Sequence, residues 1–167
     1  MEEISFNIAE GDDISIILRL LKEAAIWLEM RNIDYWKDWI NPPEAFINWI
    51  RKGFDNHEFY LIKEGSSIIG CFRLSWQDEI FWGKQSAPEG YIHSFTIDRK
   101  YLGKKKGVVV IELIEKKCKE YKSNYLRIDC SSKVHKLKKY YEDIGFQPVG
   151  ETIVRGEQLT LYEKKIL

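Results

Sequence analysis

The apolar positions of the first third of the chain recur mainly at helical spacing. Residues 1–9 alternate apolar and polar side chains, which predicts a short strand with one buried face. From residue 13 to residue 30 the apolar side chains recur every three or four positions, which predicts an amphipathic helix, with a stop and a cap supplied by residues 11–13. A second helix is expected to begin within residues 41–44, with Asn41 as its cap and prolines at its start.

After residue 57 the pattern changes to short apolar runs separated by turn residues. The expected elements are strands at 59–63, 67–76 and 91–97, a helix at 108–118, a strand at 125–129, a helix at 133–144, and strands near 146–150 and 158–162. Residues 78–89 are expected to form a loop. This order predicts an α/β (α+β) fold, a mixed, mostly antiparallel twisted sheet of about six or seven strands flanked by about four helices.

Composition narrows the class of protein without naming a function. A chain of 167 residues is the size of one compact domain, so a single domain is expected over residues 1–167. The formal net charge is zero, so any anion must be recognised by a local cluster. No early apolar run resembles a signal peptide and no stretch is apolar enough to span a bilayer, so a cytoplasmic protein that does not bind membranes is expected. Its three widely spaced cysteines are expected to be reduced thiols.

Residues 91–107, YIHSFTIDRKYLGKKKG, carry the most informative pattern in the chain. A strand is followed by a turn rich in glycine and lysine and then by the start of a helix. The first amides of a helix have no partner within the helix and lie at the positive end of its dipole, so several can bind one diphosphate. The alternative is a solvated loop in which Gly103 and Gly107 serve only the turn.

A second pattern lies in residues 136–146, KLKKYYEDIGF. Its apolar positions have helical spacing, so at least one of Tyr140 and Tyr141 is expected to be buried. Gly145 is placed to end the helix with a positive φ, and Phe146 then returns to the core. A buried tyrosine by itself indicates packing more often than catalysis.

Together, at this separation, the two segments resemble the central motifs of the GCN5-related N-acetyltransferases. In that family an Arg/Gln-x-x-Gly-x-Gly/Ala loop precedes a helix, and a later helix ends in Tyr-Glu-x-x-Gly-Phe. The chain is also similar to a bacterial branch of the superfamily in residues 126–130, in the pair Trp27-Leu28, in Tyr35-Trp36 and in His93. The similarity follows the order of the elements along nearly the whole chain.

The resemblance implies that acetyl-CoA is the cosubstrate and that no metal is needed. The strand end at Phe95 to Ile97 would pair its backbone with the pantetheine arm, and a backbone amide there would stabilise the oxyanion. Tyr141 takes the position of the tyrosine that protonates the departing thiolate. The cofactor-binding residues implied are Phe95, Ile97, Leu102, Gly103, Lys104, Lys105, Lys106, Gly107 and Val108.

Three positions depart from the family pattern. Leu102 stands where the motif has Arg or Gln, Lys105 where it has its first glycine, and Val134 where many relatives have an asparagine that contacts the cofactor. A side chain at Lys105 crowds a diphosphate or alters the turn, whereas its ammonium attracts phosphate. These departures favour, as an alternative, a family member that is weak or inactive and only binds CoA or another anion.

The acceptor side is less well defined by sequence. Trp27, Trp36 and Trp39 are candidates for a pocket that holds an amine through cation–π contact, and packing between helices is the alternative. His93 is a candidate general base because its ordinary pKa is near 6.5. The other candidates for that role are Glu89, Asp78, Glu79 and Asp129, and a chain of waters is equally consistent with the sequence.

The expected function is transfer of an acetyl group to a primary amine of a small molecule or peptide by direct attack. No enzyme nucleophile is required for such a transfer, so the cysteines need not react. Binding of nucleic acid through the lysines near 104–106 and 133–139 is the remaining alternative, and zero net charge disfavours it. The sequence leaves a homodimer open.

Overall fold

The computed structural model describes residues 2–167, which form two compact units. The first unit runs up to Arg73 and resumes over Ser94–Val110, and the second consists of Leu74–His93 and Ile111–Leu167. The boundaries cut through two strands and one helix rather than through a linker. That a single acetyltransferase domain covers residues 1–167 stays a prediction.

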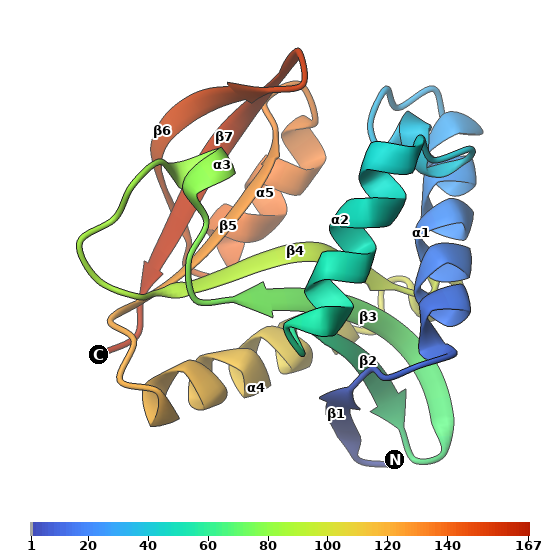
Figure 1. Cartoon of the computed structure of the whole chain (residues 1–167), viewed down its shortest axis with the longest axis horizontal. Coiled ribbons are helices and arrows are strands. Elements are labelled where there is room, and N and C mark those ends of the chain that lie inside the picture. The colour runs from blue at the N-terminus through green and yellow to red at the C-terminus, as the bar shows by residue number, and fades with distance from the viewer. Residues whose placement is uncertain (1) are drawn as a thin grey trace. The chain divides into compact units, whose positions relative to one another are not determined.

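Seven strands, five α-helices and two short 3-10 helices are present in residues 2–167 (Figure 1). The strands are β1 (Ile4–Ile8), β2 (Phe59–Glu64), β3 (Ser67–Ser75), β4 (Gly90–Ile97), β5 (Tyr125–Ser131), β6 (Gln147–Val154) and β7 (Glu157–Lys165). The helices are α1 (Asp13–Glu29), η1 (Lys37–Trp39), α2 (Glu44–Asp55), α3 (Glu79–Trp82), η2 (Arg99–Tyr101), α4 (Lys106–Glu120) and α5 (His135–Asp143).

Hydrogen bonding gives the strands the order β1-β2-β3-β4-β5-β7-β6. The pairs β1–β2, β2–β3, β5–β7 and β6–β7 are antiparallel, and β4 pairs with β5 in parallel. The mixed, mostly antiparallel sheet predicted from the sequence is therefore confirmed. The structure adds a short helix, α3, in the segment predicted to be a loop, because the Asp78 carboxylate accepts a hydrogen bond from the Phe81 amide and caps one turn.

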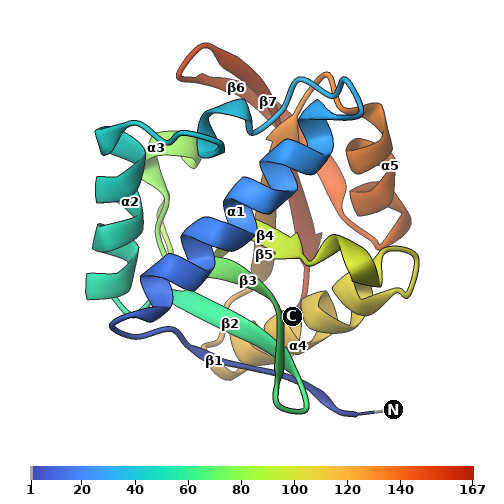
Figure 2. The ribbon, with the colours of Figure 1, turned by 90° about the vertical axis from the view of Figure 1, so that its right-hand side faces the viewer.

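In the first unit, α1 and α2 lie side by side and pack on one face of the strands (Figures 1 and 2). The amphipathic pattern of α1 explains this arrangement, since its apolar side chains are the buried ones. They meet Ile50 of α2, Phe59 and Leu61 of β2, and Cys71 of β3 in one buried cluster.

In the second unit, α5 packs against the last two strands. The Tyr141 ring contacts the rings of Phe146 and Tyr162, with centroids 5.8 and 6.0 Å away. Gly145 ends α5 at φ 101°, and the Phe146 amide donates to the Tyr141 carbonyl over 3.0 Å. The predicted stop at Gly145 is confirmed, because a positive φ suits glycine and lets the chain return to the core.

The predicted cap of α2 is wrong, whereas the cap of α1 lies within residues 11–13 as predicted but forms no side-chain hydrogen bond. The cap residue of α2 is Pro43 rather than Asn41, and no side chain caps that helix. The Pro43 carbonyl accepts from the Phe46 amide over 2.9 Å, so backbone geometry alone begins the helix. At α1, Asp12 occupies the cap position without a side-chain hydrogen bond, since it is the Asp13 carboxylate that accepts from the Glu10 amide.

Candidate active site

The turn before α4 keeps the backbone shape of a glycine motif although its residues differ. Lys105 has a φ of 54° and Gly103 a φ of 77°, so both residues lie in the left-handed region. A side chain costs about 1–2 kcal/mol in that region, which is why glycine is the usual choice. Lys105 therefore retains the turn that a glycine would give, and the substitution adds a side chain without remaking the backbone.

Only some amides of this turn are open to a ligand. The Lys104 amide donates to the Tyr101 carbonyl over 3.2 Å, and the Val108 amide to the Lys105 carbonyl over 3.2 Å. Because α4 begins at Lys106, its first amides have no acceptor one turn earlier within the helix. The amides of Lys105, Lys106 and Gly107 are thus the best candidates for an anion, and those of Lys104 and Val108 are excluded from the run Gly103 to Val108 that the sequence predicts.

The lysines of the turn are not equivalent. Lys106 forms an ion pair with Glu64 of β2 and is largely buried, whereas Lys104 and Lys105 are exposed. The ammonium groups of Lys104 and Lys106 lie 5.5 and 5.2 Å from the centre of the Tyr101 ring. Two lysines therefore offer positive charge to a bound anion, while the third fixes the first turn of α4 to the sheet.

The end of β4 approaches β3 closely. The Asp98 amide donates to the Ile69 carbonyl over 2.7 Å, and a Cβ on Gly70 would overlap the Thr96 carbonyl oxygen. Ser94, within β4, has a φ of 53°, which interrupts the regular strand. Phe95 and Ile97, expected to line the cofactor, are half-buried in this segment.

Tyr141 is buried in the second unit. Its ring packs among three aromatic rings, and a Phe ring would fill the same space. The neighbouring Glu142 accepts a hydrogen bond from the Tyr162 hydroxyl over 2.8 Å. This bond ties the Tyr-Glu motif to β7 and fixes the position of Tyr141 on α5.

Three of the candidate base residues meet in one place. His93 of β4 contacts Asp78 through Nε2 at 2.5 Å and Asp129 of β5 through Nδ1 at 3.6 Å. The three side chains are only 7–10% exposed. The Phe81 ring of α3 lies 4.5 Å from the imidazole and covers it. We call these three residues the Asp78–His93–Asp129 cluster.

Burial raises the pKa of Asp129 to about 6, against an opposing effect of His93 and a further rise from Asp78. Donor atoms of the cluster lie within 4.8 Å of one another, a spacing that a metal ion could use. The two carboxylates, however, approach different nitrogens of the ring, whereas a metal ion binds one.

Glu89, another candidate base, has a structural role. It is buried, and its Oε2 accepts hydrogen bonds from the Ser123 hydroxyl and from the amides of Asn124 and Tyr125, at 2.7, 2.8 and 2.9 Å. The carboxylate therefore fixes the start of β5. Glu79, the last candidate, is exposed on α3.

Glu89→Ala is expected to lower the free energy of unfolding by about 3 kcal/mol or more, because three buried donors lose their acceptor. Urea denaturation followed by tryptophan fluorescence measures this loss. Glu79→Ala is the matched control and should change stability by less than about 0.5 kcal/mol. Equal stability of the two variants would contradict the structural role of Glu89.

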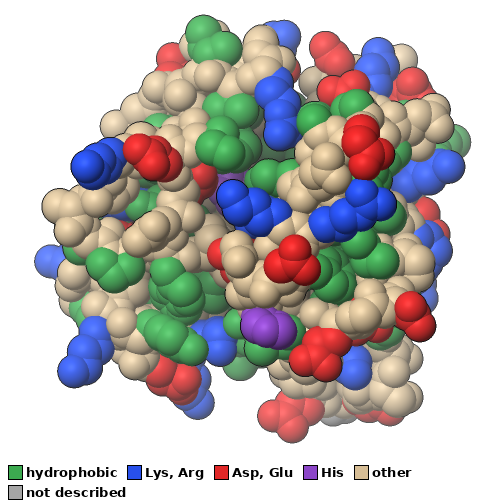
Figure 3. Space-filling model, viewed as in Figure 1, with side chains coloured by type: hydrophobic (Ala, Val, Ile, Leu, Met, Phe, Trp, Pro, Cys, Tyr) green, Lys and Arg blue, Asp and Glu red, His purple; other side chains and the backbone are tan. Residues whose placement is uncertain are grey.

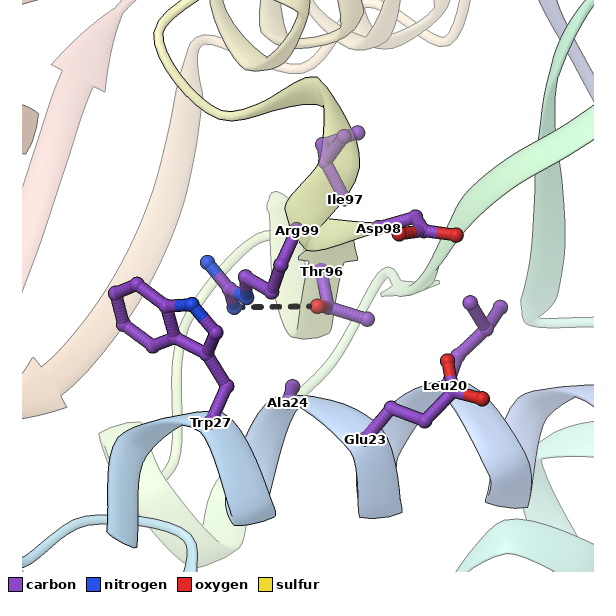
Figure 4. Close-up of a pocket in the computed structure, with 8 residues that line it drawn as sticks. All are labelled: Leu20, Glu23, Ala24, Trp27, Thr96, Ile97, Asp98 and Arg99. Carbon is purple, nitrogen blue, oxygen red and sulfur yellow. Dashed lines mark hydrogen bonds between the residues drawn. The ribbon is translucent and has the colours of Figure 1, made fainter. Parts of the chain in front are cut away.

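A small cavity of about 120 Å³ lies in the first unit between α1 and the end of β4 (Figure 4). The residues that line it are Leu20, Glu23, Ala24, Trp27, Thr96, Ile97, Asp98 and Arg99. Arg99 donates to the Thr96 hydroxyl over 3.4 Å, and its guanidinium lies 5.0 Å from the centre of the Trp27 ring. Arg31 lies 3.8 Å from the same ring, so Trp27 already has two cationic neighbours.

The three tryptophans proposed for an acceptor pocket are not brought together in one cavity. Trp39 is buried in the core against Phe46, with ring centroids 4.9 Å apart, and Trp36 packs on the edge of the same core. Only Trp27 lines the cavity. Packing between helices therefore accounts for Trp36 and Trp39.

All three cysteines are buried and free. Burial raises the pKa of the Cys118 and Cys130 thiols to about 12, and that of Cys71 further. A thiol held in its neutral form is a poor nucleophile, so these side chains contribute packing rather than chemistry.

The family model of the acetyltransferase (GNAT) family matches residues 23–146. The match covers the turn before α4, the Asp78–His93–Asp129 cluster and Tyr141. The chain belongs to the GNAT acetyltransferase family. No curated protein matches it.

Several solved structures have the same fold, and each aligns with nearly the whole of this chain. A GNAT-family acetyltransferase from Listeria monocytogenes has 22% identity and a TM-score of 0.78, over 98% of this chain and 95% of that one. A GNAT-family acetyltransferase from Streptococcus agalactiae has 18% identity and a TM-score of 0.77, over 97% of this chain and 95% of that one. A PaiA N-acetyltransferase from Thermoplasma acidophilum, solved in complex with coenzyme A, has 19% identity and a TM-score of 0.68. The alignment covers 98% of this chain and 99% of that one.

Proposed function

We propose that the protein transfers an acetyl group from acetyl-CoA to a primary amine of a small molecule or peptide. The proposal is supported by the family match together with the turn at Lys105, whose left-handed backbone is the conformation that glycine adopts most readily. A related fold has been solved with coenzyme A, and another belongs to a chimera of a spermidine N-acetyltransferase. Polyamines are therefore among the acceptors to test.

Acetyl-CoA is proposed to bind through the backbone. The amides of Lys105, Lys106 and Gly107 would hold the diphosphate at the start of α4, with charge from Lys104 and Lys105. The backbone of Phe95 and Ile97 would pair with the pantetheine arm, as an added strand does. The amides of Leu102 and Val108 donate within the turn, to the carbonyls of Arg99 and Lys105, so these two residues would contact the cofactor by their position alone. Gly103 remains a proposed contact.

Tyr141 is proposed as the general acid. An amine that attacks the thioester carbonyl gives a tetrahedral intermediate, whose collapse expels the CoA thiolate. A phenol with an ordinary pKa near 10 can donate to a thiolate whose ordinary pKa is near 8.5 when the two are held in place. A backbone amide in Phe95–Ile97 would stabilise the oxyanion. These steps need no metal and no enzyme nucleophile.

Isothermal titration with acetyl-CoA, combined with thiol release in the presence of an amine panel, tests the proposal. The panel contains polyamines, amino acids, aminoglycosides and peptide N-termini. We expect acetyl-CoA to bind and at least one amine to stimulate thiol release. Acetyl-CoA that does not bind, or binding without release on any amine, would overturn it.

Lys105→Gly is expected to weaken acetyl-CoA binding about two- to fivefold, because an exposed charge near the phosphates is lost while the turn is kept. The affinity of the variant should also fall less steeply with salt. Lys122→Gly is the matched control, since Lys122 has a φ of 58° on the turn between α4 and β5. Tighter binding by Lys105→Gly, measured by titration, would show instead that the side chain obstructs the diphosphate.

A second candidate is a family member that binds CoA or another anion without turnover. Leu102, 58% exposed where the motif has a cationic or amide side chain, favours it, since it offers no hydrogen bond to a phosphate. The titration and release assays above separate this candidate from the first, because it predicts binding alone.

Acidic and basic side chains are interspersed over the face in Figure 3, with apolar side chains between them. That face presents both signs of charge, which suits a small ligand better than a nucleic-acid backbone. Within residues 2–167 no helix is long and apolar enough to cross a membrane. We propose a cytoplasmic enzyme whose partners are the cofactor and an amine, and we leave a homodimer as a prediction.

A further inference from the structure

The cavity between α1 and the end of β4 has a basic side and an acidic side, and all the residues that line it belong to the first unit. Arg99 lies beside Trp27 on the basic side (Figure 4). The carboxylates of Glu23 and Asp98 point toward the other side (Figure 4). The Glu23 side chain is 51% exposed, so the cavity opens to solvent on its acidic side.

The carboxylates of the acidic side are balanced by cations of the protein. Nη1 of Arg19 lies 3.0 Å from a carboxylate oxygen of Glu23. Nζ of Lys100 lies 3.5 Å from a carboxylate oxygen of Asp98. The charge of Arg99 comes in addition to these two pairs, so positive charge exceeds negative charge around the cavity. An anionic ligand is therefore attracted more strongly than a cationic one.

The indole ring of Trp27 increases this excess of positive charge. Arg31 lies 3.8 Å from the centre of the ring, and Arg99 lies 5.0 Å from it. A guanidinium stacks on an aromatic ring, which holds the cation in place and adds no negative charge of its own. The cation–π contact that the sequence suggested for a ligand is thus made by side chains of the protein. Trp27 therefore holds Arg99 in position instead of receiving an ammonium.

The Thr96 hydroxyl gives the basic side a second polar group. Thr96 is buried, and its hydroxyl accepts a hydrogen bond from Nη2 of Arg99 over 3.4 Å (Figure 4). A hydroxyl that accepts one hydrogen bond can donate another, and a guanidinium presents its donors in one plane. Carboxylates match that planar set of donors. The hydroxyl and the guanidinium together fit a carboxylate.

The size of the cavity limits what it can hold. Its volume is about 120 Å³. A cavity of about 150 Å³ is large enough for a benzene molecule. The cavity therefore has room for a carboxylate and the few carbon atoms next to it, whereas a nucleotide would not fit.

We propose that this cavity binds a carboxylate of the acceptor, so that the preferred acceptor is an amine that also carries a carboxylate, such as a free amino acid, rather than a polyamine. The proposal rests on the proposed function and names its substrate class. Arg99 and Thr96 would bind the carboxylate, and Trp27 is a positioning residue that acts through Arg99. Thr96 and Ile97 line the cavity and also belong to the β4 segment proposed to hold the pantetheine arm. The acceptor and the thioester would thus meet along one strand of the first unit.

A phosphate of acetyl-CoA is the other anion that Arg99 could attract. The first turn of α4 is already proposed to hold the diphosphate, and the small volume of the cavity favours the acceptor. The two sources predict different results for Arg99→Gln. Loss of an acceptor contact raises the KM for the amine, whereas loss of a cofactor contact lowers the affinity for acetyl-CoA.

Lysine and cadaverine form a matched pair of acceptors, because they differ only in the carboxylate. With the wild type, kcat/KM for lysine should exceed that for cadaverine at least tenfold, since a hydrogen-bonded charge pair contributes about that much. Arg99→Gln should raise the KM for lysine about tenfold, with kcat and the Kd of acetyl-CoA nearly unchanged. Arg51→Gln is the matched control, since Arg51 is an exposed arginine of α2 outside the cavity, and it should keep the wild-type preference.

Ligand-observed nuclear magnetic resonance tests the subsite without any turnover. Propionate and its neutral analogue propionamide are the probes. We expect the wild type to bind propionate and not propionamide, and Arg99→Gln to lose the propionate signal. Arg31 is exposed, so Arg31→Gln tests the same charge without a risk to folding, and it should weaken propionate binding a fewfold. Arg51→Gln should bind propionate as the wild type does.

The outcomes separate this proposal from the proposed function. If cadaverine is acetylated as well as lysine, or if propionate does not bind, the carboxylate subsite is wrong and the acetyltransferase stands. If Arg99→Gln lowers acetyl-CoA affinity and leaves the KM for lysine unchanged, the cavity belongs to the cofactor and the subsite is again wrong. If the wild type acetylates no amine of the panel, the proposed function fails, and the assignment of this cavity to an acceptor fails with it.

Discussion

Replacing Tyr141 by phenylalanine is expected to lower turnover about a hundredfold, the usual contribution of one general acid. Acetyl-CoA affinity should change little. The ring is buried among Tyr140, Phe146 and Tyr162, and phenylalanine keeps those contacts and loses only the hydroxyl. The effect should therefore lie in kcat, because a proton donor acts when the thiolate leaves and not when the cofactor binds.

Tyr140→Phe is the matched control, since Tyr140 is the adjacent tyrosine on α5 and the substitution removes the same hydroxyl group. Its turnover should stay within about threefold of the wild type, well short of the usual contribution of a general acid. Steady-state thiol release and titration of acetyl-CoA measure both variants. If Tyr141→Phe keeps wild-type turnover, Tyr141 serves packing alone, and a fall in Tyr140→Phe would move the acid to that residue.

Gly70→Ala is expected to cause the largest loss of stability among single methyl additions, about 3 kcal/mol. Gly70 lies in β3, and a Cβ there would overlap the Thr96 carbonyl and lie 3.1 Å from the Ile97 Cα. Both neighbours are backbone atoms, so the β3–β4 contact must shift rather than a side chain rotate. Because this segment is proposed to pair with the pantetheine arm, acetyl-CoA affinity should fall in the same variant.

Gly150→Ala provides the control, since a Cβ there meets nothing within 4 Å in β6. It should change the free energy of unfolding by less than about 1 kcal/mol and leave acetyl-CoA affinity unchanged. Urea denaturation and titration calorimetry measure the two effects. Gly70→Ala with the stability of the control would contradict the close approach of the strands. A loss of stability without a loss of affinity would contradict the proposed role of the segment Phe95–Ile97 in binding acetyl-CoA.

The elements with strong periodicity were predictable from the sequence. The continuous apolar runs of β2 and β3, the amphipathic pattern of α1 and the glycine at the end of α5 are local preferences that the structure keeps. The cap of α2 was not predictable in this way, because an asparagine and two prolines compete for the same helix start and Pro43 provides it through its backbone. The single turn of α3 is too short for its apolar side chains to show a helical periodicity.

The candidate site was predictable as a set of residues but not as an arrangement. Sequence named Asp78, His93 and Asp129 as separate candidates for one base, and the structure brings all three together. The pairing of Ile92 with Ile128 explains the meeting of two of them, since the next step along the parallel strands sets His93 beside Asp129. The register between two strands is set by the assembled sheet, so the sequence of either strand alone does not predict it. Glu89 shows the converse, because only the three hydrogen bonds it accepts distinguish a structural carboxylate from a base.

Mass spectrometry of the amine panel, after incubation with acetyl-CoA and the wild-type protein, shows whether this chain moves an acetyl group to an amine nitrogen, with Tyr141→Phe as the parallel sample. We expect at least one amine to gain a single acetyl group on nitrogen, and the variant to form far less of the product in the same time. An unchanged panel, or equal product from both proteins, would contradict it.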